Sequence, residues 1–358
     1  MADADAPQCS GAIDAWDPEF GSVGLRVGAL FIIMASSAFM TLFPVVTRRT
    51  RMAIPPWAFD FCKFFGSGVI IATAFIHLLA PAASDEELGS PCLSESFQNY
   101  DFAFAFAMIS SFATFVVELV AFRVGANLAK SLAYDPHMGG HHHAAEHGNP
   151  PRGSMARTND ETASDDAPKD AAAKDKDSTD LEAVAQLDKD QQGLSAAASQ
   201  ILGVGVLEFG VIFHSVIIGI TLGTTQDEFK ILFIVIIFHQ MFEGLGLGSR
   251  LALLPLAPGS KIPFIGAIAY ALVTPIGMAI GLGVRNTYNG DSATAAYVTG
   301  IFDAFSAGIL LYTGFVELLA HEFIFNEKMR TAPLAKVLLN VVEMLAGAGI
   351  MALLGRWA

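Results

Sequence analysis

Eight apolar stretches, each about as long as a helix that crosses a bilayer, limit what this chain can fold into. A hydrocarbon core of roughly 30 Å needs about 20 helical residues. The stretches run approximately over 23–46, 64–83, 102–124, 201–222, 231–248, 263–284, 297–320 and 337–354. They lack the alternation of barrel strands, and lipid-exposed backbone must be satisfied within a helix or a closed barrel. We therefore predict an all-α membrane protein with eight transmembrane helices.

The composition agrees with a membrane location. Hydrophobic residues make up 53% of the 358 residues, and the mean hydropathy is +0.49, above what soluble globular proteins usually carry. A net charge of −14 gives no support for a nucleic-acid partner. The acidic start, MADADAPQCS, has no apolar core, so we expect no signal peptide and a retained first helix.

The distribution of basic residues in the links predicts the orientation. The second and fourth links are mainly acidic, whereas the first, fifth and seventh links carry Arg48, Arg49, Arg51, Arg250, Lys261, Lys328, Arg330 and Lys336. Because basic links stay in the cytoplasm, the odd-numbered links are expected there, with both termini outside the cell. We expect a multi-pass protein of the plasma membrane.

The chain divides into four parts. Residues 1–22 form an extracellular tail, 23–124 carry the first three helices, and 201–358 carry the last five. Between them, 125–200 mixes charged residues, Ala and Pro, which cannot bury enough apolar area to fold. We expect a disordered cytoplasmic loop, either a plain polar linker or a weak metal collector through His137, His141, His142, His143 and His147.

Ionisable residues inside the predicted helices are the candidates for chemistry. Each costs about 2.5 to 3.5 kcal/mol near the middle of a bilayer, so each needs a partner or a wet cavity. We expect a structural hydrogen-bonding role for Glu118, Glu208, Asp303 and Glu343. The remaining ionisable residues inside the predicted helices are the candidates for binding or transport, namely His77, His214, His239, Glu243 and Glu317.

His239 and Glu243 predict a metal site. They are four residues apart, about 40° around a helix, so imidazole and carboxylate lie on one face. His214 is a candidate for a second imidazole from the neighbouring helix, with Ser215 and Gln240 as adjacent oxygen donors. Two imidazoles and a carboxylate suit zinc, Fe(II) or Mn(II), and no thiol or thioether indicates Cu(I).

A structural alternative stays open for the same residues. They could hydrogen-bond to each other and only lock two helices together. Small-residue stripes on both helices permit close backbone approach and are compatible with either interpretation: Gly219 with Gly223, and Gly244 with Gly248.

An intramembrane metalloprotease is excluded, and we predict no enzyme. Its HExxH motif needs a second His one turn after the first. The pair His321-Glu322 is instead followed by Phe325 at that position.

Three cysteines are too few for a disulfide framework. Cys9 and Cys92 both fall on the predicted outer side, where a disulfide can persist, and this bond is left open. Cys62 is expected to be a small core residue.

Four motifs resemble the ZIP family, the Zrt- and Irt-like metal transporters. They are GVIIATAFIHLLAP at 68–81, LEFGVIFHSVIIGITLG at 207–223, HQMFEGLGLG at 239–248 and SAGILLYTGFVELLA at 306–320. The resemblance implies inverted three-helix repeats around a central two-helix metal site. It implies that divalent metal, zinc first, moves into the cytosol between the fourth and fifth helices.

The resemblance also implies roles for individual residues. His214, His239 and Glu243 would be the principal ligands, with Ser215 and Gln240 at a second position. His77 would help metal ions to enter, and Glu208 and Glu317 are further candidates along the pathway. Some relatives carry a carboxylate four residues after the fourth-helix His, where this chain has Ile218. This departure favours a single transported ion.

These observations predict a carrier whose partners are a divalent metal ion and the lipid bilayer, without a resident cofactor. Zinc is the expected substrate, with an iron(II) or broad-range (Fe, Mn, Cd) transporter of the same fold as the first alternative. A membrane metal sensor that binds the ion without transporting it is the alternative from another class. A homodimer is left open.

Overall fold

The computed structural model describes residues 23–50, 55–131, 174–225, 229–257, 259–287, 290 and 292–357. Within these residues, eight helical spans are long and apolar enough to cross a membrane, which confirms the predicted number. The predicted all-α class is confirmed as well.

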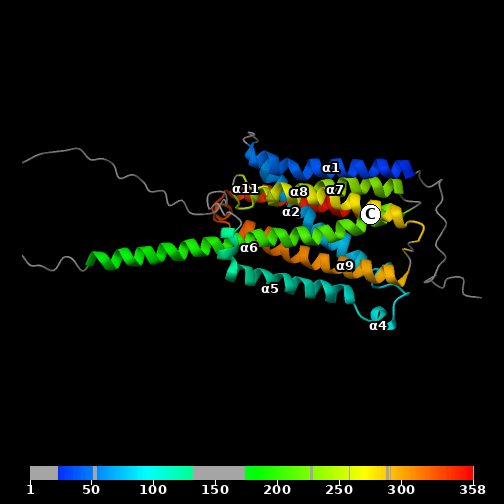
Figure 1. Cartoon of the computed structure of the whole chain (residues 1–358), viewed down its shortest axis with the longest axis horizontal. Helices are drawn as coiled ribbons and strands as arrows, with labels where there is room; N and C mark the ends of the chain where they lie inside the picture. Colours follow the sequence, from blue (N-terminus) through cyan, green and yellow to red (C-terminus); the bar gives the residue numbers. More distant parts are fainter. Residues whose placement is uncertain are drawn as a thin grey trace, which may run out of the picture.

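The spans are built from the following helices, shown in Figure 1. The first is α1 (Val23–Arg49), and the second joins α2 (Pro56–Ala72), η2 (Thr73–Leu79) and α3 (Ala80–Ala82). The third to sixth are α5 (Phe102–Ser131), α6 (Lys174–Thr224), α7 (Phe229–Leu253) and α8 (Ile262–Val284). The seventh joins α9 (Ala293–Thr313) and η3 (Gly314–Phe325), and the eighth is α11 (Leu334–Leu354). Short helices α4 (Glu95–Gln98) and α10 (Glu327–Arg330) lie in links.

Two helices extend into the segment 125–200, for which a disordered loop was predicted. Helix α5 continues to Ser131, and α6 begins at Lys174, well before its apolar part. The sequence DLEAVAQLDKDQQGL at 180–194 is rich in Ala, Leu, Glu, Gln and Lys, which are good helix formers even without a buried face. Composition alone indicated too little apolar area for a core, but a helix that extends from a spanning segment needs no core of its own.

The packing order repeats between the two ends of the chain. Helix α1 packs on α7 as α8 packs on α6. Helix α2 packs on α7 and α11, and its counterpart α9 packs on α6 and α5. Each counterpart also passes into a π-helical segment, η2 in the second span and η3 in the seventh. This reciprocal pattern is what inverted repeats around α6 and α7 predict.

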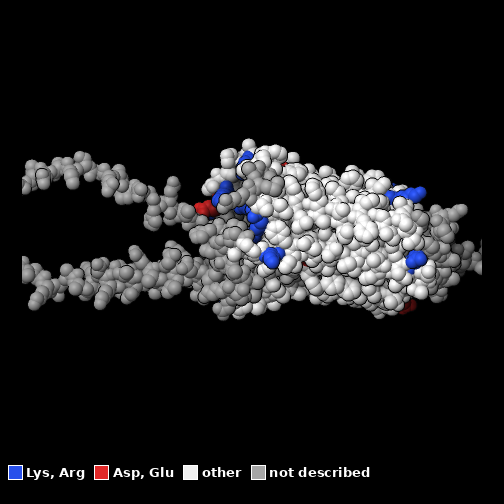
Figure 2. Space-filling model, turned by 45° about the horizontal axis from the view of Figure 1, so that its top comes forward, with Lys and Arg blue, Asp and Glu red and all other residues white. Residues whose placement is uncertain are grey.

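The charged side chains mark the two ends of the bundle. In Figure 2, Lys and Arg gather near both ends of the face in view, and the band between them is almost uncharged, as a bilayer requires. The start of α1, the short α4 and the C-terminus lie at one end, and the long α6 extends beyond the other (Figure 1).

The glycine stripes allow close packing of helices, but they do not join α6 to α7 as the sequence suggested. Each stripe packs on a different neighbour. A Cβ atom on Gly219 would lie 2.4 Å from the Thr274 carbonyl oxygen of α8, and one on Gly248 would lie 2.2 Å from the Thr41 carbonyl oxygen of α1. The stripes of α6 and α7 therefore face outward to α8 and α1. They do not press α6 against α7, so side chains meet between these two helices.

A substitution at Gly246 of α7 tests the close packing of α7 on α2. A Cβ atom there would lie 2.8 Å from the carbonyl oxygen of Gly66 in α2, so Gly246→Ala must push two backbones apart. We expect a loss of about 1 to 3 kcal/mol in stability, measured as a lower thermal midpoint in detergent. Gly283→Ala on α8 is the matched control, because no atom of the described residues lies within 4 Å of its added Cβ. Equal midpoints for the two variants would contradict the close approach.

Candidate metal centre

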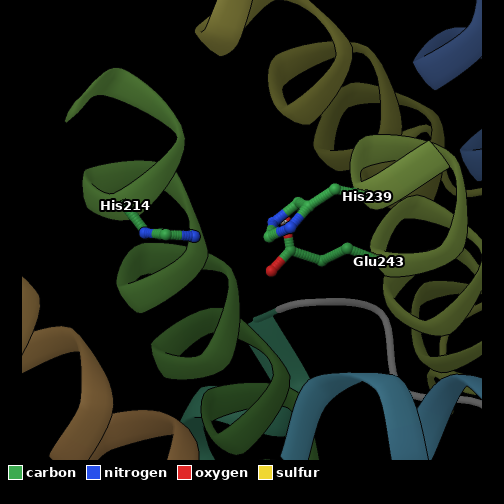
Figure 3. A group of neighbouring side chains, drawn as sticks. All are labelled: His214, His239 and Glu243. Carbon is green, nitrogen blue, oxygen red and sulfur yellow. Dashed lines mark ion pairs between the residues drawn. The ribbon is translucent and has the colours of Figure 1, made fainter. Parts of the chain in front are cut away.

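Three buried side chains from two helices form the candidate metal centre. His214 comes from α6, and His239 and Glu243 come from α7. Each offers a ligand atom within 4.8 Å of the other two. In Figure 3 the tip of the His214 ring points across the gap toward His239 and Glu243. The prediction that one helical turn of α7 and one residue of α6 meet at a shared point agrees with this geometry.

The distances suit one ion with small adjustments. His239 Nε2 lies 3.8 Å from Glu243 Oε2, and the two imidazole centroids are 5.5 Å apart. Two ligand atoms on one tetrahedral zinc ion lie about 3.4 Å apart, given bonds of about 2.1 Å. A closing movement of a few tenths of an ångström would bring the α7 pair to this separation.

The ligand atoms are buried but have no hydrogen-bond partner among the described residues. This holds for both ring nitrogens of His214, Nε2 of His239 and Oε1 of Glu243. Buried polar atoms in folded proteins are nearly always satisfied by protein, water or an ion. The structural alternative requires these side chains to satisfy one another, and they do not.

Ser215 and Gln240 lie beside the triad in the sequence and are also buried. The hydroxyl of Ser215 and both amide atoms of Gln240 have no partner among the described residues. The structure thus leaves further oxygen donors near the centre. Their assignment to a second position stays a prediction.

Tyr270 of α8 is a residue of the centre that the sequence analysis missed. Its buried hydroxyl lies 3.2 Å from Glu243 Oε2 and 2.9 Å from the backbone oxygen of Gln240, and donates its proton to one of them. Such a partner fixes the orientation of a ligating carboxylate. A tyrosine within an apolar helix carries no signal in the sequence, because its partner is known only from packing.

His77 lies against the centre. Its ring is perpendicular to that of His239, with centroids 4.6 Å apart. Its Nε2 lies 3.0 Å from the carbonyl oxygen of Met351, which can only accept, so Nε2 carries the proton and Nδ1 keeps a lone pair. The predicted role of His77 in helping ions to enter stays a prediction.

Glu208 and Glu317, the other predicted pathway residues, lie away from the triad. Glu208 is six residues before His214, about 9 Å along α6, and its carboxylate lies against Gly266 of α8. Glu317 lies against Gly203, further toward the start of α6. Both are therefore displaced toward the end of the bundle from which α6 extends.

Asp303 of α9 was expected to have only a structural role, yet it borders the centre. Its Oδ1 lies 3.6 Å from Nδ1 of His214 and has no hydrogen-bond partner among the described residues. Asp303 also hydrogen-bonds Glu87. Burial, followed by the nearby carboxyl of Asp303, raises the pKa of Glu87 to about 9. Sequence analysis missed Glu87 because it lies in an acidic link that resembles solvated surface.

A second buried charged cluster lies on α2, α7 and η3. Glu322 accepts from Lys63 at 2.5 Å and from Arg250 at 2.7 Å, and Arg250 also bonds the hydroxyl of Ser67 at 2.5 Å. Arg250 was expected in a cytoplasmic link but is buried in α7. The carboxylate of Glu322 is therefore paired with two cationic side chains, those of Lys63 and Arg250.

Several predicted residues are not placed. The loop histidines lie outside the described residues, namely His137, His141, His142, His143 and His147. Cys9 also lies outside them, whereas Cys92 is disulfide-bonded. Cys62 is a free, buried thiol, as expected of a small core residue.

Comparisons with known proteins agree with the arrangement. Residues 23–355 match the family described as "ZIP Zinc transporter". Zinc-regulated transporter 1 of Saccharomyces cerevisiae is 40% identical, covering 94% of this chain and 88% of that protein. Zinc-regulated transporter 2 of the same yeast is 36% identical over 94% of this chain and 95% of that protein. Zinc-regulated transporter 1 of Schizosaccharomyces pombe is 37% identical over 98% and 89%. The chain therefore belongs to the ZIP zinc transporter family.

Proposed function

We propose that this chain carries divalent metal ions, zinc foremost, into the cytosol through the centre formed by His214, His239 and Glu243. The observation that carries the proposal is a set of buried ligand atoms where α6 faces α7, for which the described residues provide no hydrogen-bond partner. Two imidazole nitrogens and a carboxylate oxygen suit zinc, and the relatives at 36 to 40% identity are described as zinc-regulated transporters.

The donor set favours an exchangeable ion over a permanent one. Three protein ligands leave a tetrahedral ion with an open position, which water or a neighbouring oxygen donor can fill, unlike a closed structural site. An ion that arrives from outside exchanges most of its water for these ligands. It leaves when the centre opens to the opposite side. Binding strong enough to admit the ion and weak enough to release it is the requirement for conduction.

The residues between α6 and α7 favour binding of one metal ion at a time over binding of two. Ile218 occupies the position one turn after His214 and packs with the apolar cluster around Leu222 and Phe229. A second ion between α6 and α7 would therefore lack a carboxylate ligand at position 218. Ser215 or Gln240 can then supply the fourth ligand of the same ion.

The ends of the bundle support an orientation with both termini outside. Arg49, at the end of α1, donates to the backbone oxygens of Leu254, Leu256 and Ala257. The first and fifth links therefore share one end, and basic links are retained in the cytoplasm. Residence in the plasma membrane is part of this proposal.

Metal flux into sealed vesicles tests the function. Purified protein in proteoliposomes should give saturable zinc accumulation, whereas liposomes without protein should show none. Zinc binding without accumulation would overturn transport and support a sensor. The same vesicles challenged with Fe(II), Mn and Cd would rank the metals, because all of them accept nitrogen and oxygen ligands.

A further inference from the structure

The structure contains two groups of buried carboxylates with opposite surroundings. Glu322 is neutralised by Lys63 and Arg250. Glu87 and Asp303 are also buried, at 9% and 4% exposure, but neither pairs with Lys or Arg within the described part of the chain. Each keeps an oxygen without a hydrogen-bond partner there, Oε2 of Glu87 and Oδ1 of Asp303. Buried carboxylates are normally paired with cations or coordinate metals.

Local packing holds the two carboxyls together. The segment with Glu87 and Leu88 lies against Gly300 of α9, where an added Cβ would come within 2.6 Å of Leu88 and 3.1 Å of Glu87. Gly300 and Asp303 are three residues apart, on one face of the helix. The absence of a side chain at 300 thus lets Glu87 reach the hydrogen bond with Asp303.

A third donor points at this pair from the metal centre. His214 is 2% exposed, and its Nδ1 lies 3.6 Å from Asp303 Oδ1 without a hydrogen-bond partner among the described residues. This separation is too long for a hydrogen bond. It is close to the roughly 3.4 Å between two ligands of one tetrahedral zinc ion. His214 therefore has one nitrogen toward the central triad and the other toward Asp303.

The pair also lies on the side from which an ion would arrive. Glu87 falls outside the spanning segments, after α3 and before α4. Helix α4 lies at the end that holds the C-terminus (Figure 1), which is the outer end in the proposed orientation.

We propose that Glu87 and Asp303 form an outer site for a divalent cation, which captures the ion and passes it to His214. The inference rests on the proposed transport function. The hydrogen bond between Glu87 and Asp303 requires one proton, so the arriving ion displaces this proton into the outer solution and is then held by both carboxylates beside Nδ1 of His214. The ion then moves to the ligands on α7, and the ring proton of His214 passes from Nε2 to Nδ1, because a neutral imidazole offers one lone pair at a time.

Uptake kinetics of Glu87→Gln test capture. Removing one carboxylate should raise the zinc concentration for half-maximal uptake about tenfold, the lower end of what loss of a supporting group at a metal site costs. The maximal rate should stay within about twofold of wild type, because the central triad is intact. Glu86→Gln is the matched control, since its neighbouring carboxylate is exposed and carries the same charge. It should leave both parameters unchanged. An unchanged half-maximal concentration in Glu87→Gln, or equal shifts in both variants, overturns the outer site.

Zinc binding without transport provides the second measurement. In Glu243→Ala protein, equilibrium dialysis should find that the remaining zinc ion binds about tenfold more weakly when Glu87→Gln is added, and with unchanged affinity when Glu86→Gln is added. Equal binding in all three proteins overturns the outer site, even if wild-type vesicles transport zinc. Failure of the proposed function is a different result, namely wild-type vesicles that accumulate no zinc. Size-exclusion profiles identical to wild type establish that each variant is folded.

Discussion

Glu243→Ala is expected to lower zinc uptake by about 100-fold or more while the protein stays folded and inserted. Glu243 is fully buried, lies one helical turn from His239 and is the single carboxylate of the triad. Changes to groups that merely support metal ligands already cost about 10- to 100-fold. The loss of a ligand should cost at least as much. Uptake into proteoliposomes with matched protein content measures the effect.

The neighbouring Met241→Ala provides the control. Met241 lies on the same turn of α7 and is only partly buried, so truncating it removes similar bulk without removing a ligand. Its uptake should stay within about twofold of wild type. Uptake by Glu243→Ala at the level of Met241→Ala would show that the triad does not carry the ion.

The sequence predicted the parts of this protein that depend on local pattern. Apolar stretches of bilayer length indicate spanning helices, because the length of a span and the cost of polar backbone in lipid leave little choice. The spacing of His239 and Glu243 placed both on one face of α7, since helical geometry fixes positions four residues apart. Spacing carries no information across helices, so the approach of His214 was only one possible arrangement of neighbouring helices until the resemblance to a family supported it.

Contacts between distant segments could not be predicted in the same way. Asp303, Glu87 and Tyr270 reach the centre from two helices and a link, and only tertiary packing defines their neighbours. The glycine stripes showed that α6 and α7 pack closely on something, but a stripe does not identify its partner. Arg250 was assigned to a link because charge usually marks a helix end, yet Glu322 compensates it inside the bundle.

Glu322→Gln is expected to destabilise the protein by about 3 to 5 kcal/mol, because it strands two buried cations. The carboxylate binds Lys63 and Arg250 together, and the three side chains are between 8% and 12% exposed. The amide keeps the size of the side chain but removes the charge, so packing changes little. A lower thermal midpoint in detergent, with zinc absent, measures the loss.

Lys336→Met is the matched control, since it breaks an ion pair with Asp60 whose partners are 55% and 35% exposed. Solvent screens such a pair, which contributes roughly 0 to 1 kcal/mol, so its midpoint should hardly move. Adding Lys63→Met to Glu322→Gln removes one stranded cation and should recover part of the loss. If Lys63→Met restores none of the thermal midpoint, or if Glu322→Gln and Lys336→Met lower the midpoint equally, then charge compensation by Glu322 does not stabilise this end of the bundle. Because Arg250 follows Glu243 by two helical turns on one face of α7, the same measurement tests whether charge pairing stabilises this end of the helix that carries two of the candidate metal ligands.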